Sequence, residues 1–158
     1  MYVSKIMTQP VFSCSLEDSL ERAAGKMWNH DLGCLPVVNK EGEVVGMITD
    51  RDICMAAYTQ GVALTNISVS SAMSQSVYFC TPDDSVQDAE EKMASHRVRR
   101  LPVLNENRKL IGLLALSDLA QEAEREIGIE RKEISRREVT DTFATITQPR
   151  GFQMIPHA

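Results

Sequence analysis

The sequence predicts an α+β fold made of two tandem repeats, each with the order strand, helix, strand, strand, helix, packed as a pseudo-two-fold module. Two observations predict it. The chain of 158 residues matches itself without a gap when it is shifted by 66 residues, so that positions 3 to 53 align with positions 69 to 119. Eighteen of these 51 positions are identical, and both copies carry the same order of local signals.

Each copy begins with a short extended stretch followed by an amphipathic helix. The extended stretches are 11–14 and 77–80. Asp18 and Asp84 are the expected N-caps of the helices, because Glu or Gln follows three residues later. Apolar residues then recur at helical spacing, which predicts a buried face that includes Met27 in the first copy and Met93 in the second.

Two strands and a second helix complete each copy. The tripeptide Leu-Pro-Val, at 35–37 and 101–103, predicts the first strand, and a polar turn follows it. The apolar runs 44–48 and 110–114 have the length of a strand. A second helix is expected to begin near Asp50 in one copy and near Ser117 in the other.

A copy of about 55 residues is too small to bury its own apolar face well, so the two copies are expected to pack on each other. We divide the chain into a first repeat, 1–61, a second repeat, 62–124, and a charged C-terminal tail, 125–158. Within the tail, Val139, Phe143 and Ile146 have helical spacing, which predicts a helix that ends before Pro149.

Composition narrows the function classes. The chain carries a net charge of -5, which opposes sequence-independent binding to nucleic acid. No apolar run approaches the ~20 residues that span a bilayer, and no secretion signal is evident, so no membrane association and a cytoplasmic location are expected. The four cysteines include no C-x-x-C pair, so neither a disulfide framework nor a metal site is expected.

Both copies also share a set of short motifs, namely Met-x-x-His at the end of the first helix, Leu-Pro-Val, and Gly followed six residues later by Asp. The last motif is Gly46-Met47-Ile48-Thr49-Asp50-Arg51-Asp52 in the first copy. In the second copy Asp118 is kept and Ala115 replaces the threonine. Over about residues 3 to 124 the chain resembles a tandem pair of cystathionine-beta-synthase (CBS) domains, a Bateman module.

The resemblance implies two clefts that hold an adenosine-containing ligand, either an adenine nucleotide (AMP, ADP or ATP) or S-adenosylmethionine, with no metal cofactor. It implies that Asp52 and Asp118 accept hydrogen bonds from ribose hydroxyls. It also implies that the Thr49 hydroxyl contacts phosphate or ribose. In the second copy Ser117 is the candidate substitute for the hydroxyl that Ala115 lacks.

Thr49 and Asp52 also have an explanation without a ligand. Their spacing is that of a helix capping box, in which each side chain bonds to the backbone of the other residue. Asp118 in a first helical turn is likewise favoured by the helix dipole alone. Both interpretations remain open from the sequence.

Arg97, Arg99 and Arg100 crowd the approach to the second Leu-Pro-Val, where the first copy has Asp31, Gly33 and Cys34. Guanidinium groups pair with phosphate in a planar, bidentate geometry, so we expect at least one of the three to contact phosphate. A solvated surface is the alternative.

The sequence contains no nucleophile motif, P-loop or dinucleotide fingerprint, so no enzyme activity is expected. The favoured function is a regulatory sensor that binds an adenine nucleotide and acts on an unidentified regulated protein. The alternative is a CBS-type dimerisation or interaction scaffold without a ligand. A homodimer is expected in either case, because a small module with outer helices commonly buries them against a symmetric copy.

Overall fold

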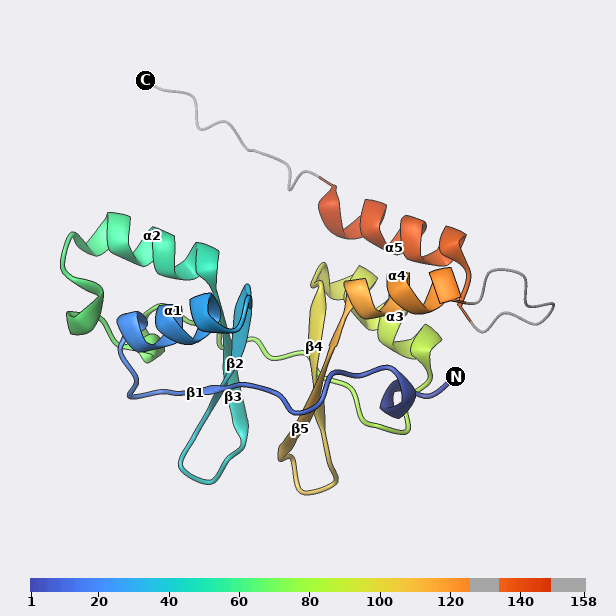
Figure 1. The fold of residues 1–158 in the computed structure, drawn as a ribbon, viewed down its shortest axis with the longest axis horizontal. Helices are drawn as coiled ribbons and strands as arrows, with labels where there is room; N and C mark the ends of the chain where they lie inside the picture. The colour runs from blue at the N-terminus through green and yellow to red at the C-terminus, as the bar shows by residue number, and fades with distance from the viewer. Residues whose placement is uncertain (126–133, 149–158) are drawn as a thin grey trace.

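The structure, a computed structural model, describes residues 1–125 and 134–148. Two sheets stand side by side in the middle of the molecule, and the helices lie on the outside (Figure 1). The first repeat contains β1 (Cys14–Ser15), α1 (Leu20–Asn29), β2 (Cys34–Val38), β3 (Val44–Thr49) and α2 (Asp50–Gln60). The second contains α3 (Val86–His96), β4 (Arg100–Leu104), β5 (Leu110–Ala115) and α4 (Leu116–Arg125), and α5 (Arg136–Thr147) follows.

The two sheets have the same register, which confirms the expected pseudo-two-fold α+β fold. β2 and β3 are antiparallel with Cys34 opposite Thr49, and β4 and β5 are antiparallel with Arg100 opposite Ala115. β1 adds a parallel strand to the first sheet. Its expected counterpart at 77–80 is reduced to one parallel bridge between Cys80 and Val103, so the strand prediction was wrong there.

The expected helix caps at Asp18 and Asp84 were wrong by one residue. Ser19 caps α1 by accepting a hydrogen bond from the Arg22 N–H, and Ser85 caps α3 in the same way. Asp18 instead accepts from the Ser15 N–H in the preceding turn. Aspartate and serine both cap well, so the spacing alone does not decide between adjacent candidates.

The two repeats exchange short segments between their hydrophobic cores. The segment before the first repeat enters the core of the second, and the segment before the second repeat enters the core of the first. Val3, in the 3-10 helix η1 (Val3–Lys5), is fully buried in the core of the second repeat. Val69, in η3 (Val69–Ser71), is fully buried in the core of the first, next to η2 (Leu64–Asn66). Figure 1 accordingly places the N-terminus beside the second repeat. This exchange ties the repeats together.

Two glycines permit the crossing segments to approach the sheets. Thr8 pairs with Leu113 through two backbone hydrogen bonds. A Cβ on Gly112 would lie 2.7 Å from the Met7 sulfur, and one on Gly46 would lie 2.5 Å from the Met73 sulfur. A Cβ on Gly46 would also lie 2.9 Å from the backbone oxygen of Ser74, so a larger residue there forces the crossing segment away from the sheet, whereas at Gly112 the Met7 side chain has to move.

The helix predicted from Val139, Phe143 and Ile146 is α5, and it packs on α3 and α4. Val139, Thr142 and Ile146 are its buried residues. The charged stretch 126–133, which belongs to the predicted tail, lies outside the described residues. Among the helices that the structure describes, none has the length and apolar character required to cross a membrane.

Candidate functional site

A cavity of about 430 Å³ lies between the two repeats, and we call it the interrepeat cleft. The first repeat contributes the junction of β3 and α2, including Thr49 and Asp52. The second contributes the turn from α3 into β4. Ser74, Ser76 and Tyr78, in the segment that joins the repeats, also line the cavity. The full lining is Gly33, Cys34, Met47, Thr49, Asp50, Arg51, Asp52, Ser74, Ser76, Tyr78, Arg97, Val98, Arg99 and Arg100.

Thr49 and Asp52 form the capping box that their spacing allows. The Thr49 N–H and hydroxyl donate to Oδ2 of Asp52 at 2.9 and 2.7 Å, and the Asp52 N–H donates to Oγ1 of Thr49 at 3.1 Å. Within the described residues, the hydrogen bonds to this carboxylate all fall on Oδ2. Oδ1 is therefore the oxygen available to a ligand.

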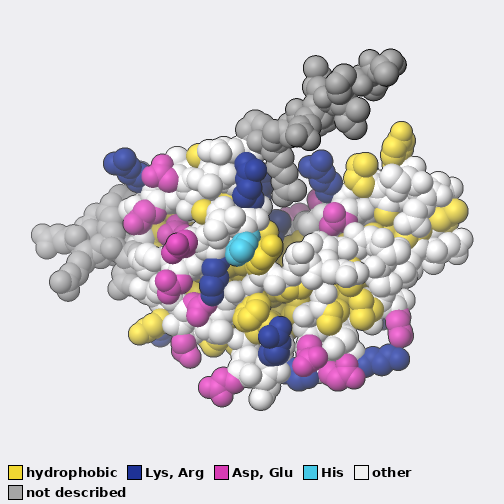
Figure 2. Space-filling view, turned by 180° about the vertical axis from the view of Figure 1, so that it is seen from behind, with side chains coloured by type: hydrophobic (Ala, Val, Ile, Leu, Met, Phe, Trp, Pro, Cys, Tyr) yellow, Lys and Arg dark blue, Asp and Glu magenta, His cyan; other side chains and the backbone are white. Residues whose placement is uncertain are grey.

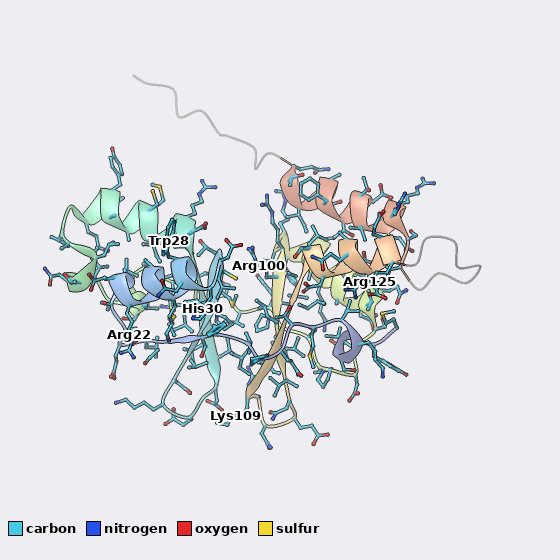
Figure 3. The ribbon with its side chains drawn as sticks, viewed as in Figure 1. Arg22, Trp28, His30, Arg100, Lys109 and Arg125 are labelled. Atoms are coloured by element: carbon cyan, nitrogen blue, oxygen red, sulfur yellow. The ribbon has the colours of Figure 1, made fainter. Side chains whose placement is uncertain are left out.

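All three predicted arginines line this cleft. Arg97 ends α3 in the left-handed conformation, with φ 54°, and Asp31 has the same conformation at the matching place in the first repeat, with φ 53°. Arg100 begins β4 and lies between the two repeats (Figure 3). A guanidinium nitrogen of Arg100 is 3.5 Å from the position that a Cβ on Gly33 would occupy. The Arg100 guanidinium thus packs against the backbone at Gly33.

The cleft has the opposite charge to the rest of the protein. Four arginines and two aspartates line it, whereas the whole chain carries a net charge of -5. Burial raises the pKa of the Cys34 thiol, although the nearby Arg100 lowers it, so the net shift favours the neutral thiol. An anionic ligand therefore matches this cleft better than a cationic one.

The counterpart of this site in the second repeat is built differently. Asp118 accepts a hydrogen bond from the Ala115 N–H at 2.8 Å, and burial raises the pKa of its carboxyl. Asp118 does not line the interrepeat cleft. Ser117 lines a separate cavity of about 420 Å³ between α4 and α5, which also borders on Arg99 and Arg100. The predicted residues therefore divide into two groups, with Ser117 and Asp118 outside the cleft.

Sequence analysis missed several residues that line the cleft. Arg51 stands inside the motif that was noted, and its charge was a usable signal. Ser74, Ser76 and Tyr78 lie in the joining segment and carry no spacing pattern of their own. Tyr78 stacks on His96 at the end of α3, with ring centroids 3.7 Å apart, and Phe12 stacks on His30 in the first repeat. Each stack fixes the segment that precedes the first helix of its repeat against the end of that helix.

Among the described residues, no three His, Cys, Asp or Glu side chains are grouped closely enough to hold a metal ion. Hydroxyls, guanidinium groups, carboxylates and a tyrosine ring line the cleft instead. These groups suit a ligand with a sugar, a flat ring and negative charge.

Comparison with known proteins gives the family. The CBS domain family model matches residues 3–58 and 69–125. The CBS domain-containing protein YhcV of Bacillus subtilis is 39% identical over 118 residues, which covers 75% of this chain and 82% of YhcV. Two further relatives are homoserine O-acetyltransferases, of which the match covers about a quarter. CBS pairs thus occur both in small proteins and as parts of enzymes.

Solved structures agree with this result. The crystal structure of Hypoxic Response Protein I, which holds two coordinated zinc ions, has a TM-score of 0.70 and 29% identity, covering 77% of this chain and 98% of that one. The CBS domain pair of protein MJ0100, in complex with 5-methylthioadenosine and S-adenosyl-L-methionine, has the same TM-score at 24% identity, covering 77% and 94%. The chain belongs to the CBS domain family and consists of a tandem pair of CBS domains.

Proposed function

We propose that the chain is a regulatory module that binds an adenosine phosphate in the interrepeat cleft and has no catalytic activity. One observation carries this proposal: the cleft joins a carboxylate with a free oxygen, on Asp52, to a cluster of arginines from the other repeat. Its volume of about 430 Å³ lies within the range of small-molecule sites, roughly 300–1,000 Å³.

The first-repeat side of the cleft suits the ribose. Oδ1 of Asp52 is available to accept from one or both vicinal hydroxyls. The Thr49 hydroxyl already donates to Asp52 and accepts from its N–H, so we assign Thr49 the role of positioning Asp52. Thr49 and Asp52 can then form a capping box and still take part in a ligand site, so the two interpretations are compatible.

The second-repeat side suits the phosphates. Arg97, Arg99 and Arg100 belong to one turn and the start of one strand, and together with Arg51 they line the cleft from both repeats. Charge-assisted, bidentate bonds of this kind are about twice as strong as neutral ones. We therefore expect AMP, ADP or ATP to bind more tightly than adenosine, and also more tightly than S-adenosylmethionine, which has no phosphate.

We propose one strong nucleotide site in each chain. In the second repeat, burial raises the pKa of the Asp118 carboxyl, and Ala115 supplies no hydroxyl. The cavity that Ser117 lines borders largely on apolar residues of α4 and α5. Ser117 and Asp118 are thus candidates for a weaker site.

We also propose that the chain forms a homodimer through α1 and α2. Trp28 is 88% exposed and Tyr58 is 83% exposed, and a cavity of about 520 Å³ lies between the two helices. Trp28 lies at this cavity (Figure 3), and hydrophobic side chains protrude at the end of the molecule that carries α2 (Figure 2). Sedimentation equilibrium tests the dimer: we expect twice the monomer mass of 17.6 kDa, lost in Trp28→Glu, and a wild-type monomer at micromolar concentration contradicts it.

Titration calorimetry with AMP, ADP, ATP, adenosine and S-adenosylmethionine tests the binding function directly. We expect heat and a raised melting temperature with the phosphorylated ligands, because a ligand that binds only the folded state stabilises it. If none of these compounds gives heat or stabilisation at millimolar concentration, the sensor function is wrong. The ligand-free interaction scaffold, which the exposed α1 and α2 face supports, is then the function that remains.

A further inference from the structure

Helix α5 contacts two of the arginines that line the interrepeat cleft. A terminal nitrogen of Arg97 donates to the backbone carbonyl of Gln148, at the C-terminal end of α5, over 2.6 Å. The guanidinium carbon of Arg99 lies 6.0 Å from the ring centroid of Phe143, within the range of a cation–π contact. The same two residues thus line the cleft and contact α5.

Arg97 also compensates the helix dipole of α5. The last turn of α5 contains no basic residue of its own, so Arg97 supplies positive charge at the negative end of the helix. An anion that binds Arg97 from the cleft removes this compensation and adds negative charge near the same helix end. Phosphate binding and the docked position of α5 are therefore in electrostatic conflict.

The surface beneath α5 contains a polar defect. Glu90 on α3 is only 6% exposed, and its Oε1 has no hydrogen-bond partner among the described residues. Glu138 in the first turn of α5 adds a second negative charge nearby, and burial is the larger cause that raises the pKa of Glu90 to about 7. A buried carboxyl oxygen that has no partner among the described residues makes the docking of α5 less stable than an apolar interface of the same size.

We propose that α5 is a strap that phosphate binding releases: the phosphates of a ligand in the interrepeat cleft take Arg97 and Arg99 away from Gln148 and Phe143, and α5 leaves α3 and α4. This inference rests on the proposed nucleotide site. A phosphate oxygen is a stronger acceptor for a guanidinium than a carbonyl or a ring face, so the exchange favours the ligand.

The release of α5 uncovers the groove between α3 and α4. In the first repeat the matching groove, between α1 and α2, is already open. The groove between α3 and α4 corresponds to the groove between α1 and α2, where Met27 and Ile53 border on the open cavity. Met27 and Ile53 are 5% and 6% exposed at this cavity, and Met93 and Leu119, at the matching positions of the second repeat, are 0% exposed. Nucleotide binding is thereby converted into the exposure of a second apolar helical face.

Hydrogen exchange of the full chain with ATP or adenosine tests this proposal. ATP is expected to protect the junction of β3 and α2 and at the same time to speed exchange in α5. Adenosine has no phosphate, so it is expected to protect the first segment without changing α5.

Phe143→Ala provides an independent test, because it frees Arg99 from α5. Phe143 is half-exposed, so the substitution creates no large core cavity. We expect ATP to bind about two- to fivefold more tightly, the equivalent of one exposed cation–π contact. The matched control is Thr145→Ala, at an exposed position of the same helix, which is expected to leave ATP affinity unchanged.

Three results overturn the proposal in distinguishable ways. If ATP protects the cleft while α5 exchanges as slowly as before, α5 is a fixed part of the second repeat and the nucleotide site stands. If Phe143→Ala binds ATP no more tightly than the wild type, α5 is likewise a fixed part of the second repeat. If ATP protects no segment and gives no heat, the nucleotide site itself is wrong and the strap fails with it.

Discussion

The two repeats share a backbone and differ in what surrounds it. The first repeat has the complete capping box of Thr49 and Asp52 and an open helical face with Trp28 at its edge. The second has lost the threonine, carries the arginine cluster, and is covered by α5. One fold thus supplies a cleft side with a carboxylate, a cleft side with an arginine cluster, and two unlike outer faces. The difference between the repeats, rather than their symmetry, creates the proposed function.

The largest expected effect concerns Glu90 in the covered repeat. Its pKa is about 7 in the folded chain, mainly through burial, against an ordinary value of 4.5. The folded state therefore binds the proton more tightly, and the free energy of unfolding decreases as pH rises from about 4.5 to about 7. At about 1.4 kcal/mol per pKa unit, the decrease is at most about 3–4 kcal/mol.

Denaturant unfolding between about pH 4 and pH 8 measures this effect. Glu90→Gln is expected to remove most of the dependence and to be more stable than the wild type at pH 8. Glu91→Gln, on the exposed side of α3, is the control and is expected to keep the wild-type profile. Identical profiles for wild type and Glu90→Gln mean that Glu90 is solvated and that α5 does not bury it.

Arg100→Ala tests the phosphate side. A hydrogen bond to a charged group contributes about 1.5–3 kcal/mol, so we expect a loss of roughly 10- to 150-fold in ATP affinity and almost no change for adenosine. Arg125→Ala removes a surface arginine distant from the cleft (Figure 3) and is the control. If Arg99→Ala and Arg100→Ala both bind ATP, ADP and AMP as tightly as the parent, the arginines are solvated surface residues and the site assignment is wrong.

Asp52→Asn and Asp118→Asn compare equivalent positions of the two repeats. We expect Asp52→Asn to weaken adenosine and ATP equally, by about tenfold, because one charge-assisted bond to ribose is lost. Asp118→Asn is expected to leave both affinities near the wild-type value. Calorimetry that finds equal losses for the two variants breaks the comparison and indicates two equivalent sites.

The smallest expected effects concern the caps. Thr49→Ala removes one half of the capping box and is expected to reduce stability by about 1 kcal/mol, whereas Thr49→Ser retains it. Ala115→Thr introduces the missing hydroxyl opposite Asp118 and is expected to raise stability by up to about 1 kcal/mol. Thermal unfolding of the three variants checks these values. A destabilised Ala115→Thr shows that the second repeat has no room for the hydroxyl.

Much of the fold was predictable because the repeat encodes local signals twice. The strands around Leu-Pro-Val and the helices with Met27 and Met93 lie where periodicity predicted them. The exchange of Val3 and Val69 between the cores was not predictable, since an apolar residue in a short segment does not specify which core it enters. Only the tertiary arrangement decides that.

The site was predictable to the same extent. Thr49 and Asp52 were identified by the resemblance to CBS domains and the arginines by their crowding, and the structure brings both groups to one cleft. The separation of Ser117 and Asp118 from that cleft depends on how the repeats face each other. The contacts of Arg97 and Arg99 with α5 join residues 51 and 44 positions apart in sequence, which no local pattern connects.

The most direct test of the account is a crystal structure of the full chain with ADP. The account predicts one ADP in the interrepeat cleft, with its ribose on Oδ1 of Asp52 and its phosphates on at least one of Arg97, Arg99 and Arg100. ADP bound at Asp118 instead, or equally at both aspartates, contradicts the division of roles between the two repeats.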